Sequence, residues 1–186
     1  MHIFVSDELK ETASIPAPWG SIAFTFALGD LWEVAFSLDP VSPESQDTSI
    51  LNSPWVEAVH EILDTGRSLT KEEREALFLT KRAQNFTQTT RKVLEETSLL
   101  PCGTFKTYGE IAESIGSPDA VRAVGQILAR NPFPILIPCH RVMAKAMIDN
   151  LDILNPKSFE GKAFGGREDF VAIGAWLRMN DLTHAA

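Results

Sequence analysis

The sequence predicts an α/β protein of the α+β kind, in which a strand-rich part precedes a helix-rich part. Apolar and polar residues alternate in residues 20–40, whereas several later segments carry apolar residues at helical spacing. Hydrophobic residues make up 44% of the 186 residues and charged residues 23%, a composition that allows a sizeable core. The change of pattern near residues 80–85 predicts an N-terminal lobe of residues 1–83 and a C-terminal domain of residues 84–186.

Residues 20–40 are expected to form a β-hairpin, with its turn at Gly29-Asp30. The alternating apolar positions of its two strands are Ile22, Phe24 and Phe26, followed by Leu31, Val34 and Phe36. Residues 40–54 are rich in Ser, Pro and Asp, which predicts a loop. A helix is predicted over residues 55–63 and ends before Gly66, and a second is predicted over residues 86–100.

A helix-turn-helix is predicted between residues 107 and 131. Thr107 and Glu110 have the T-x-x-E spacing of a capping box, so the first helix should start at Thr107. Gly116 should end it, since glycine tolerates the left-handed conformation that follows a helix. The residues expected on its apolar face are Tyr108, Ile111, Ala112 and Ile115. Two short helices joined by a tight glycine-containing turn define this motif.

The second helix of this motif should be capped by Ser117 and run to Arg130, because Pro132 disfavours helical dihedral angles in the residue before it. The residues expected to pack inward are Val121, Val124 and Leu128. The opposite face would carry Arg122, Gly125, Gln126 and Ala129. Small residues on that face would let the helix backbone approach a DNA partner closely, although any pair of helices can expose small residues.

The net charge of −8 argues at first against a nucleic-acid partner, because phosphate contacts favour Lys and Arg. The charge is unevenly distributed, however. Residues 1–60 hold nine acidic residues and one basic residue, whereas residues 101–145 hold five basic and three acidic residues. The small basic excess therefore coincides with the predicted helix-turn-helix, although an ordinary solvated surface would explain it equally well.

A cytoplasmic protein, or a nuclear one in a eukaryote, is expected. The first residues turn acidic too soon for a signal peptide, and the longest apolar run, residues 132–138, is too short to span a bilayer. Two cysteines and four scattered histidines predict neither a disulfide framework nor a metal site.

Cys139 lies between Pro138 and His140 in the sequence IPCHRV. A thiolate is the reactive form of cysteine, and a nearby imidazole can generate it. Neighbouring side chains of an extended chain point to opposite faces, so cooperation of Cys139 with His140 requires a water relay or a turn. A buried structural cysteine is the simpler interpretation of an isolated Cys-His pair, and it is our interpretation of Cys102.

Residues 131–142, NPFPILIPCHRV, resemble the active-site signature of the O6-alkylguanine-DNA alkyltransferases. Residues 103–112, GTFKTYGEIA, and residues 121–125, VRAVG, resemble the helix-turn-helix of that family in order and spacing. The resemblance covers about residues 86–142. The N-terminal lobe is similar only in outline to the ribonuclease H-like lobe of the family.

The resemblance implies DNA repair, by irreversible transfer of an alkyl group from O6-alkylguanine in double-stranded DNA to Cys139. It implies a monomer that acts once, without a cofactor, from the minor groove and with the damaged nucleotide flipped out of the stack. His140 would act as a water-linked base, and Asn131 would brace the turn before an active-site strand. Tyr108 would crowd the target phosphate, and Arg122 would fill the space left in the duplex. The implied DNA-binding residues are Tyr108, Ala120, Val121, Arg122, Gly125 and Gln126, and the implied pocket residues are Pro134, Val142 and Phe164.

Beyond Cys139 the sequence departs from the family. The pair Gly165-Gly166 follows a long loop, and Ala163 stands where the family has a pocket tyrosine. Asn180 aligns with a glutamate that orients the histidine, and the adjacent Asp181 could serve instead. Two alternatives remain: a non-catalytic, alkyltransferase-like protein that binds O6-alkylguanine lesions and signals to other repair pathways, and a cysteine-dependent hydrolase or redox enzyme acting without DNA.

Overall fold

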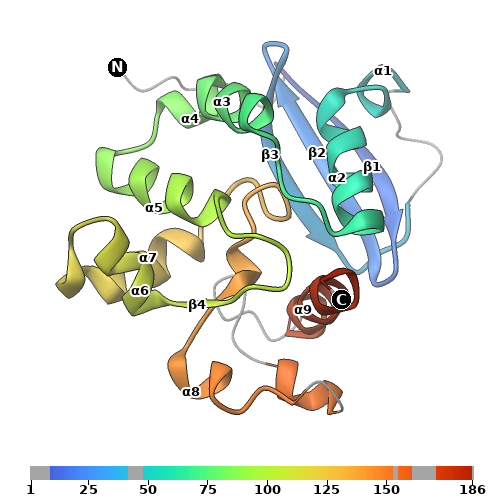
Figure 1. The fold of residues 1–186 in the computed structure, drawn as a ribbon. Coiled ribbons are helices and arrows are strands. Elements are labelled where there is room, and N and C mark those ends of the chain that lie inside the picture. Colours follow the sequence, from blue (N-terminus) through green and yellow to red (C-terminus); the bar gives the residue numbers. More distant parts are fainter. Residues whose placement is uncertain (1–8, 42–47, 153–154, 161–170, 186) are drawn as a thin grey trace.

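The computed structural model describes residues 9–41, 48–152, 155–160 and 171–185 (Figure 1). Its one three-stranded sheet within these ranges is antiparallel and consists of β1 (Lys10–Ala17), β2 (Gly20–Ala27) and β3 (Asp30–Ser37), in that order. Helices dominate the rest of the chain. The predicted α+β class is therefore confirmed.

The predicted hairpin is formed by β2 and β3, in which Phe24 pairs with Val34 and both side chains are buried. Its turn is centred on Leu28-Gly29, one residue earlier than predicted, with φ angles of 55° and 80°. Two positive φ angles in succession give the twist that a two-residue hairpin turn needs. Strand β1 was not predicted: only Ala13 and Ile15 of its residues are buried, and it contains a proline, which an edge strand tolerates.

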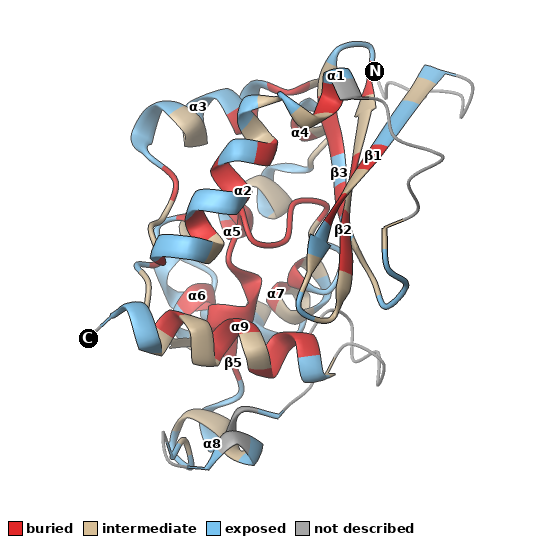
Figure 2. Cartoon of the chain, turned by 90° about the vertical axis from the view of Figure 1, so that its right-hand side faces the viewer, coloured by how far each residue is buried: buried red, intermediate tan, exposed pale blue. Residues whose placement is uncertain are grey.

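The helices of the first half are α1 (Thr48–Leu51), α2 (Pro54–Thr65), α3 (Lys71–Leu79) and α4 (Lys81–Gln84). The helix predicted over residues 55–63 is α2, which lies against the sheet in both views and ends at Gly66 with φ 69° (Figures 1 and 2). The loop predicted over residues 40–54 is wrong at its end, where α1 forms a single turn. Helices α3 and α4 were not predicted.

In the second half, the described residues form two short parallel strands, β4 (Lys106–Thr107) and β5 (Val142–Met143). They also form the 3₁₀ turns η3 (Pro118–Ala120), η4 (Cys139–Arg141) and η5 (Pro156–Phe159). The helices of this half are α5 (Gln88–Ser98), α6 (Tyr108–Ser114), α7 (Val121–Leu128), α8 (Lys145–Ile148) and α9 (Val171–His184). The helix predicted over residues 86–100 is thus present as α5. No helix among the described residues is long and apolar enough to cross a membrane.

One hydrophobic core connects the two halves, with buried residues such as Phe24, Leu94 and Ile173 in the same cluster. The two lobes that we propose, residues 1–83 and 84–186, therefore pack as one body. All of residues 132–143 are buried, and Figure 2 shows buried ribbon crossing the middle of the molecule. The Val34 N–H donates to the Pro132 carbonyl at 2.8 Å, which fixes the start of this segment to the sheet edge.

Candidate active site

Cys139 begins the 3₁₀ turn η4 instead of lying in a strand. The chain before it folds back, with the Ile137 N–H donating to the Phe133 carbonyl at 2.8 Å and Ile135 at φ 73°. The expected active-site strand is therefore wrong. This segment contains Pro132, Pro134 and Pro138, and prolines lack the N–H groups that a continuous strand ladder needs. The turn is one of the two arrangements that cooperation between Cys139 and His140 requires.

Asn131 braces this turn from the end of the helix-turn-helix. Its Nδ2 donates to the Ile137 carbonyl at 3.0 Å, and its Oδ1 accepts the Phe133 N–H at 3.0 Å. The side chain of Asn131 also forms a hydrogen bond that favours the ionised form of Cys139. One amide thus holds both limbs of the loop and contacts the thiol at its end.

His140 is buried behind the thiol and contacts a carboxylate from α9. Its Nε2 lies 3.2 Å from Asp181 Oδ2, and the residue is 3% exposed. Burial lowers the pKa of His140, against the opposing effect of Asp181, so the ring is neutral near pH 7. Its Nδ1 is buried and has no hydrogen-bond partner among the described residues, which leaves a site for a water molecule or a proton.

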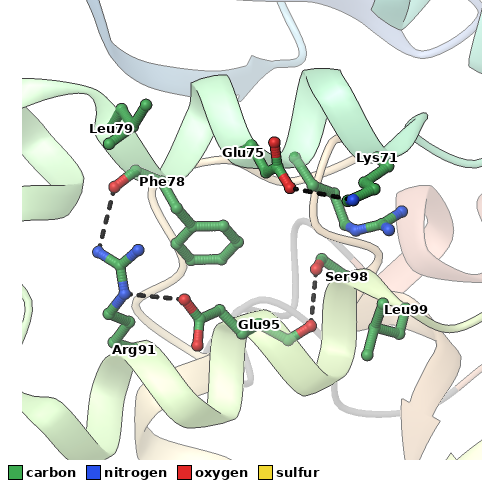
Figure 3. Close-up of a pocket in the computed structure, with 9 residues that line it drawn as sticks. Lys71, Glu75, Phe78, Leu79, Arg91, Glu95, Ser98 and Leu99 are labelled. Atoms are coloured by element: carbon green, nitrogen blue, oxygen red, sulfur yellow. Dashed lines mark hydrogen bonds and ion pairs between the residues drawn. The ribbon is translucent and has the colours of Figure 1, made fainter.

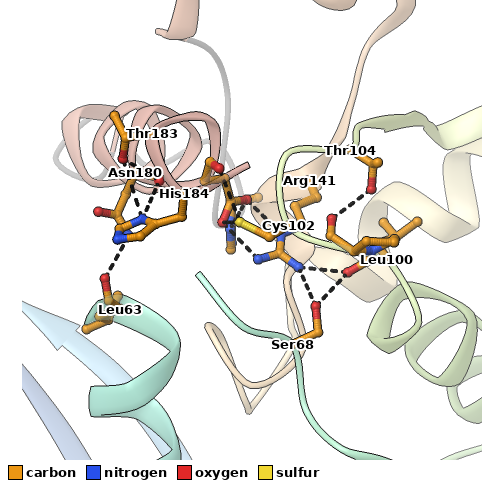
Figure 4. Close-up of polar contacts among 12 residues, drawn as sticks. Leu63, Ser68, Leu100, Cys102, Thr104, Arg141, Asn180, Thr183 and His184 are labelled. Atoms are coloured by element: carbon orange, nitrogen blue, oxygen red, sulfur yellow. Dashed lines mark hydrogen bonds and ion pairs between the residues drawn. The ribbon is translucent and has the colours of Figure 1, made fainter. Parts of the chain in front are cut away.

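Asp181, and not Asn180, holds the imidazole, which answers the question that the sequence left open. The Nδ2 of Asn180 donates instead to the Leu63 carbonyl at 3.0 Å (Figure 4). The two residues are neighbours on α9, where adjacent side chains point about 100° apart, so only one of them can face η4.

Arg141 fixes the same carboxylate with a two-pronged contact. Its Nε and Nη2 donate to the two oxygens of Asp181 at 2.6 and 2.8 Å. Its Nη1 donates to the Leu100 carbonyl at 2.7 Å and to Ser68 Oγ at 3.2 Å (Figure 4). Burial alone would raise the pKa of Asp181, but the hydrogen bonds from His140 and Arg141 hold it well below its usual range. The carboxylate therefore stays ionised and oriented toward the histidine.

The thiol of Cys139 is protonated at rest. Burial raises its pKa to about 11, although Asn131, the backbone N–H groups of the turn and the charge of Arg178 all act in the opposite direction. A thiol with such a pKa needs a base to become a nucleophile. The neutral ring of the adjacent His140 is the base that the turn provides.

The first helix of the predicted helix-turn-helix is present as α6. Thr107 Oγ1 accepts the Glu110 N–H at 3.0 Å and Glu110 accepts the Thr107 N–H at 2.6 Å, so the capping box is confirmed. Gly116 follows the helix with φ 72°, as predicted. Tyr108 begins α6, and the pairing of β4 with β5 brings it close enough to Cys139 for an electrostatic interaction.

The second helix differs from its prediction at both ends. It starts with η3, where the side chain of Ser117 makes no capping hydrogen bond, and α7 ends at Leu128 instead of Arg130. Val121 was expected in the core but is 43% exposed, because it opens α7 beside the exposed turn of residues 117–119. Of the predicted DNA-binding residues on this segment, Val121, Arg122 and Gln126 are exposed, and Ala120 and Gly125 are half-buried.

The basic segment offers fewer usable charges than its composition indicated. Arg141 is buried on Asp181, Lys106 lies 3.1 Å from a glutamate of α5, and Lys145 lies 3.5 Å from an aspartate one turn later. Arg122 and Arg130 are exposed and make no ion pair within the described ranges. The unpaired cations of this segment therefore lie in and directly after α7.

Of the predicted pocket residues, Pro134 and Val142 are buried beside the turn. Phe164 lies outside the described residues, as do Ala163 and Gly165-Gly166. Two buried arginines of the site, Arg141 and Arg178, were not predicted from the sequence. The only available signal was positional: the first directly follows the Cys-His pair, and the second precedes Asp181 by one helical turn.

Cys102 also contacts this charge cluster. Its Sγ donates to the Asp181 carbonyl at 3.1 Å and lies 3.5 Å from the carboxylate (Figure 4). Burial and the charge of Asp181 raise the pKa of Cys102 to about 11. This thiol is therefore a hydrogen-bond donor that supports Asp181, in agreement with a structural cysteine.

A groove of about 500 Å³ lies between α3 and α5, away from the cysteine turn (Figure 3). Four of its charged residues form ion pairs within a helix, Lys71 with Glu75 at 3.8 Å and Arg91 with Glu95 at 2.8 Å, and a fifth, Arg74, donates to a backbone carbonyl. None of its lining residues is a predicted site residue. We therefore assign the chemistry to η4.

Part of the chain is similar in sequence to a known family. Residues 88–149 match the family model of the 6-O-methylguanine DNA methyltransferase, DNA binding domain. The methylated-DNA–protein-cysteine methyltransferase of Archaeoglobus fulgidus is 41% identical over 78 residues, which are 42% of this chain and 51% of that protein. The constitutive enzyme of Bacillus subtilis is 46% identical over 63 residues, 34% of this chain and 38% of that protein. The matched segments thus span about half the length, or less, of these relatives.

The likeness in fold extends over nearly the whole chain. The structure of the O6-methylguanine methyltransferase of Mycobacterium tuberculosis superposes with a TM-score of 0.62 and 20% identity. The superposition includes 95% of this chain and 95% of that chain. The M. tuberculosis OGT in complex with DNA gives a TM-score of 0.61, 19% identity and 94% coverage of each chain. Identities this low show the fold alone. Residues 88–149 are similar in sequence to the DNA-binding domain of the 6-O-methylguanine DNA methyltransferases, and the rest of the chain shares their fold.

Proposed function

We propose that this protein repairs DNA by transferring an alkyl group from the O6 atom of guanine to the thiol of Cys139, irreversibly and once per molecule. The observation that carries the proposal is the buried turn in which Cys139 precedes a histidine held by an ionised carboxylate. The same turn is braced by Asn131, at the end of the helix-turn-helix. Recognition and chemistry would thus be connected by a single side chain.

The transfer starts with loss of the thiol proton, which passes through a water molecule to Nδ1 of His140. That atom is the buried nitrogen of the ring that has no hydrogen-bond partner in the described part of the chain, and the Nε2 of His140 lies against Asp181, which stabilises the imidazolium. The thiolate then attacks the alkyl carbon. A carbon–sulfur bond forms, the carbon–O6 bond breaks with its electron pair on the guanine, and the proton held by His140 passes through water to the guanine. No oxidant, metal or cofactor is needed for this balance.

The DNA would approach α7 from the minor groove. Arg122 and Gln126 are exposed on this helix, and the half-buried Gly125 lets its backbone come close to the duplex. Arg122 would occupy the space left by the flipped nucleotide, while Tyr108 would press on the target phosphate. Ala120 and Val121 would complete the contact. The base pocket would be lined by Pro134, Val142 and Phe164. The protein would work as a monomer, in the cytoplasm or in a eukaryotic nucleus.

The direct test is the intact mass of the protein after incubation with a duplex oligonucleotide containing O6-methylguanine. We expect a gain of one methylene group, located by peptide mass on Cys139 and not on Cys102, and no gain in Cys139→Ala. Tight lesion binding with unchanged mass would replace our proposal by the alkyltransferase-like alternative. If the protein shows no binding and no change in mass, a role on this lesion is excluded.

The role of the helix-turn-helix is tested by comparing two substrates. Arg122→Ala should slow repair in duplex DNA far more than reaction with free O6-benzylguanine, because only the duplex needs a nucleotide to be flipped. Lys71→Ala, which removes a 75% exposed cation from α3, is the matched control and should affect neither substrate. Equal losses with both substrates in Arg122→Ala would contradict the flipping role.

A further inference from the structure

Arg178 is a buried cation on α9 that the mechanism above does not use. It is 1% exposed and is one of the largest fully buried side chains of the protein. It precedes Asp181 by three positions, so both side chains project from the same face of α9. That face packs against η4, the turn of Cys139, where Asp181 meets His140 and Arg141. Arg178 therefore lies one turn of α9 before Asp181, on the side of the helix that packs against η4.

The guanidinium of Arg178 interacts electrostatically with two ionisable groups of the site. One is the thiol of Cys139 and the other is the phenol of Tyr108, at the start of α6. Burial lowers the pKa of Arg178 to about 10, so it is charged near pH 7. Arginine is rarely this deeply buried, because removing its charge from water is costly. The charge is nevertheless kept beside the thiol of Cys139 and the phenol of Tyr108.

We propose that Arg178 is an electrostatic positioning residue, whose charge favours the thiolate of Cys139 as the thiol proton leaves. The inference rests on the proposed function, because alkyl transfer is the step that needs the thiolate. The electrostatic effect itself rests only on the cluster of Arg178, Cys139 and Tyr108. A cation near a thiolate lowers the free energy of the ionised form, and the effect is strong where water is excluded.

The charges around Cys139 then divide into two sets with different tasks. On η4 and α9, Asp181 stabilises the imidazolium of His140, and Arg141 neutralises the excess charge of that carboxylate. Also on α9, Arg178 stabilises the thiolate. From α6, the phenol of Tyr108, whose pKa is raised by burial, interacts electrostatically with the same thiol. The ion pair that proton transfer creates thus finds a complementary charge at each end.

The test is the rate of alkylation of Cys139 by iodoacetamide between pH 7 and pH 9, where Arg178 is charged, with the adduct located by peptide mass. We expect Arg178→Met to lower this rate about tenfold, because loss of the charge raises the pKa of the thiol by about one unit and each unit changes the thiolate fraction tenfold. Arg178→Lys, which keeps the charge, should react at nearly the wild-type rate. Lys71→Met removes one exposed positive charge from α3 and should leave the rate unchanged.

A purely structural role for Arg178 predicts a different result. Its neutral variants would then lose stability in thermal unfolding but keep the wild-type alkylation rate between pH 7 and pH 9, and this outcome would overturn the proposal. Arg178→Gln provides the same test if Arg178→Met does not fold. Iodoacetamide needs no DNA, so a slower alkylation in the neutral variants supports the role of Arg178 even if the wild-type protein takes no methyl group from O6-methylguanine. In that case the proposed function fails and the electrostatic role remains.

Discussion

The cysteine turn is held from two sides, and the two sides are built differently. On the side of the helix-turn-helix, the contacts join residues close in sequence, such as Thr107 with Glu110 and Asn131 with Phe133. On the side of α9, Asp181 contacts His140 and Arg141, which lie about forty positions away. The side of the helix-turn-helix, here called the near side, consists of caps and turn braces that join neutral groups or lie at the surface. The side of α9, here called the far side, consists of buried charges, so its residues depend on one another.

The comparison predicts that the largest loss of stability follows from breaking the far side. Asp181→Asn leaves Arg141 buried with half of its counter-ion contact and without a neutralising charge. We expect the free energy of unfolding to fall by about 3–5 kcal/mol, as when one partner of a buried ion pair is removed. Urea denaturation at pH 7.5 measures this change.

Asn180→Ala is the matched control on the next residue of α9. It removes one part-buried hydrogen bond to the Leu63 carbonyl, which is worth about 1 kcal/mol. An equal loss in both variants would show that the charge cluster has no special weight, and the contrast between the two sides would then be abandoned.

The near side should respond to Asn131→Ala with a smaller loss. Two backbone groups of the turn, the Phe133 N–H and the Ile137 carbonyl, lose their partner and remain in a buried segment. We expect a loss of about 1–3 kcal/mol in urea denaturation. Alkylation of Cys139 should slow as well, because the amide favours its thiolate. Unchanged alkylation in a destabilised variant would limit Asn131 to bracing.

The same contrast explains what the sequence allowed us to predict. The capping box at Thr107, the glycine at the end of α6 and the β2–β3 hairpin follow local rules and were predicted almost to the residue. The turn at Cys139 was obscured because a short apolar run suggests a strand, and only its prolines argued otherwise. Asp181 was left undecided against Asn180, because a shift of one position on a helix changes the face and no local rule fixes that position. Arg141 and Arg178 are buried by contacts between parts of the chain that are distant in sequence, and the residues around each arginine do not indicate these contacts.

The buried histidine predicts how stability depends on pH. The pKa of His140 is lowered in the folded protein by burial, so the unfolded chain binds its proton more readily. The corresponding stability is complete above the unfolded pKa of about 6.5 and is lost as pH falls below it, by at most about 1.4 kcal/mol per pH unit. Asp181 adds a further loss only below about pH 4, where its unfolded form takes up a proton.

Urea denaturation at several values between pH 7 and pH 5 tests this dependence. The wild-type protein should lose stability over this window, and His140→Asn should lose much less, because the titrating ring is gone. An identical slope in both proteins would assign the acid sensitivity to other groups.

The smallest effect separates two caps within the helix-turn-helix. Thr107 and Ser117 both look like helix caps in the sequence, but only Thr107 has a hydrogen bond from its helix, and Ser117 precedes a 3₁₀ turn with no side-chain cap. Thr107→Ala should therefore cost about 1 kcal/mol of unfolding free energy, the usual value of a lost cap, whereas Ser117→Ala should stay within about 0.5 kcal/mol of the wild type. Urea denaturation resolves the two values if both variants are measured beside the wild-type protein. A loss near 1 kcal/mol in Ser117→Ala would mean that the Ser117 hydroxyl does cap the second helix. The sequence rule for helix caps would then describe this residue better than the observed 3₁₀ turn does.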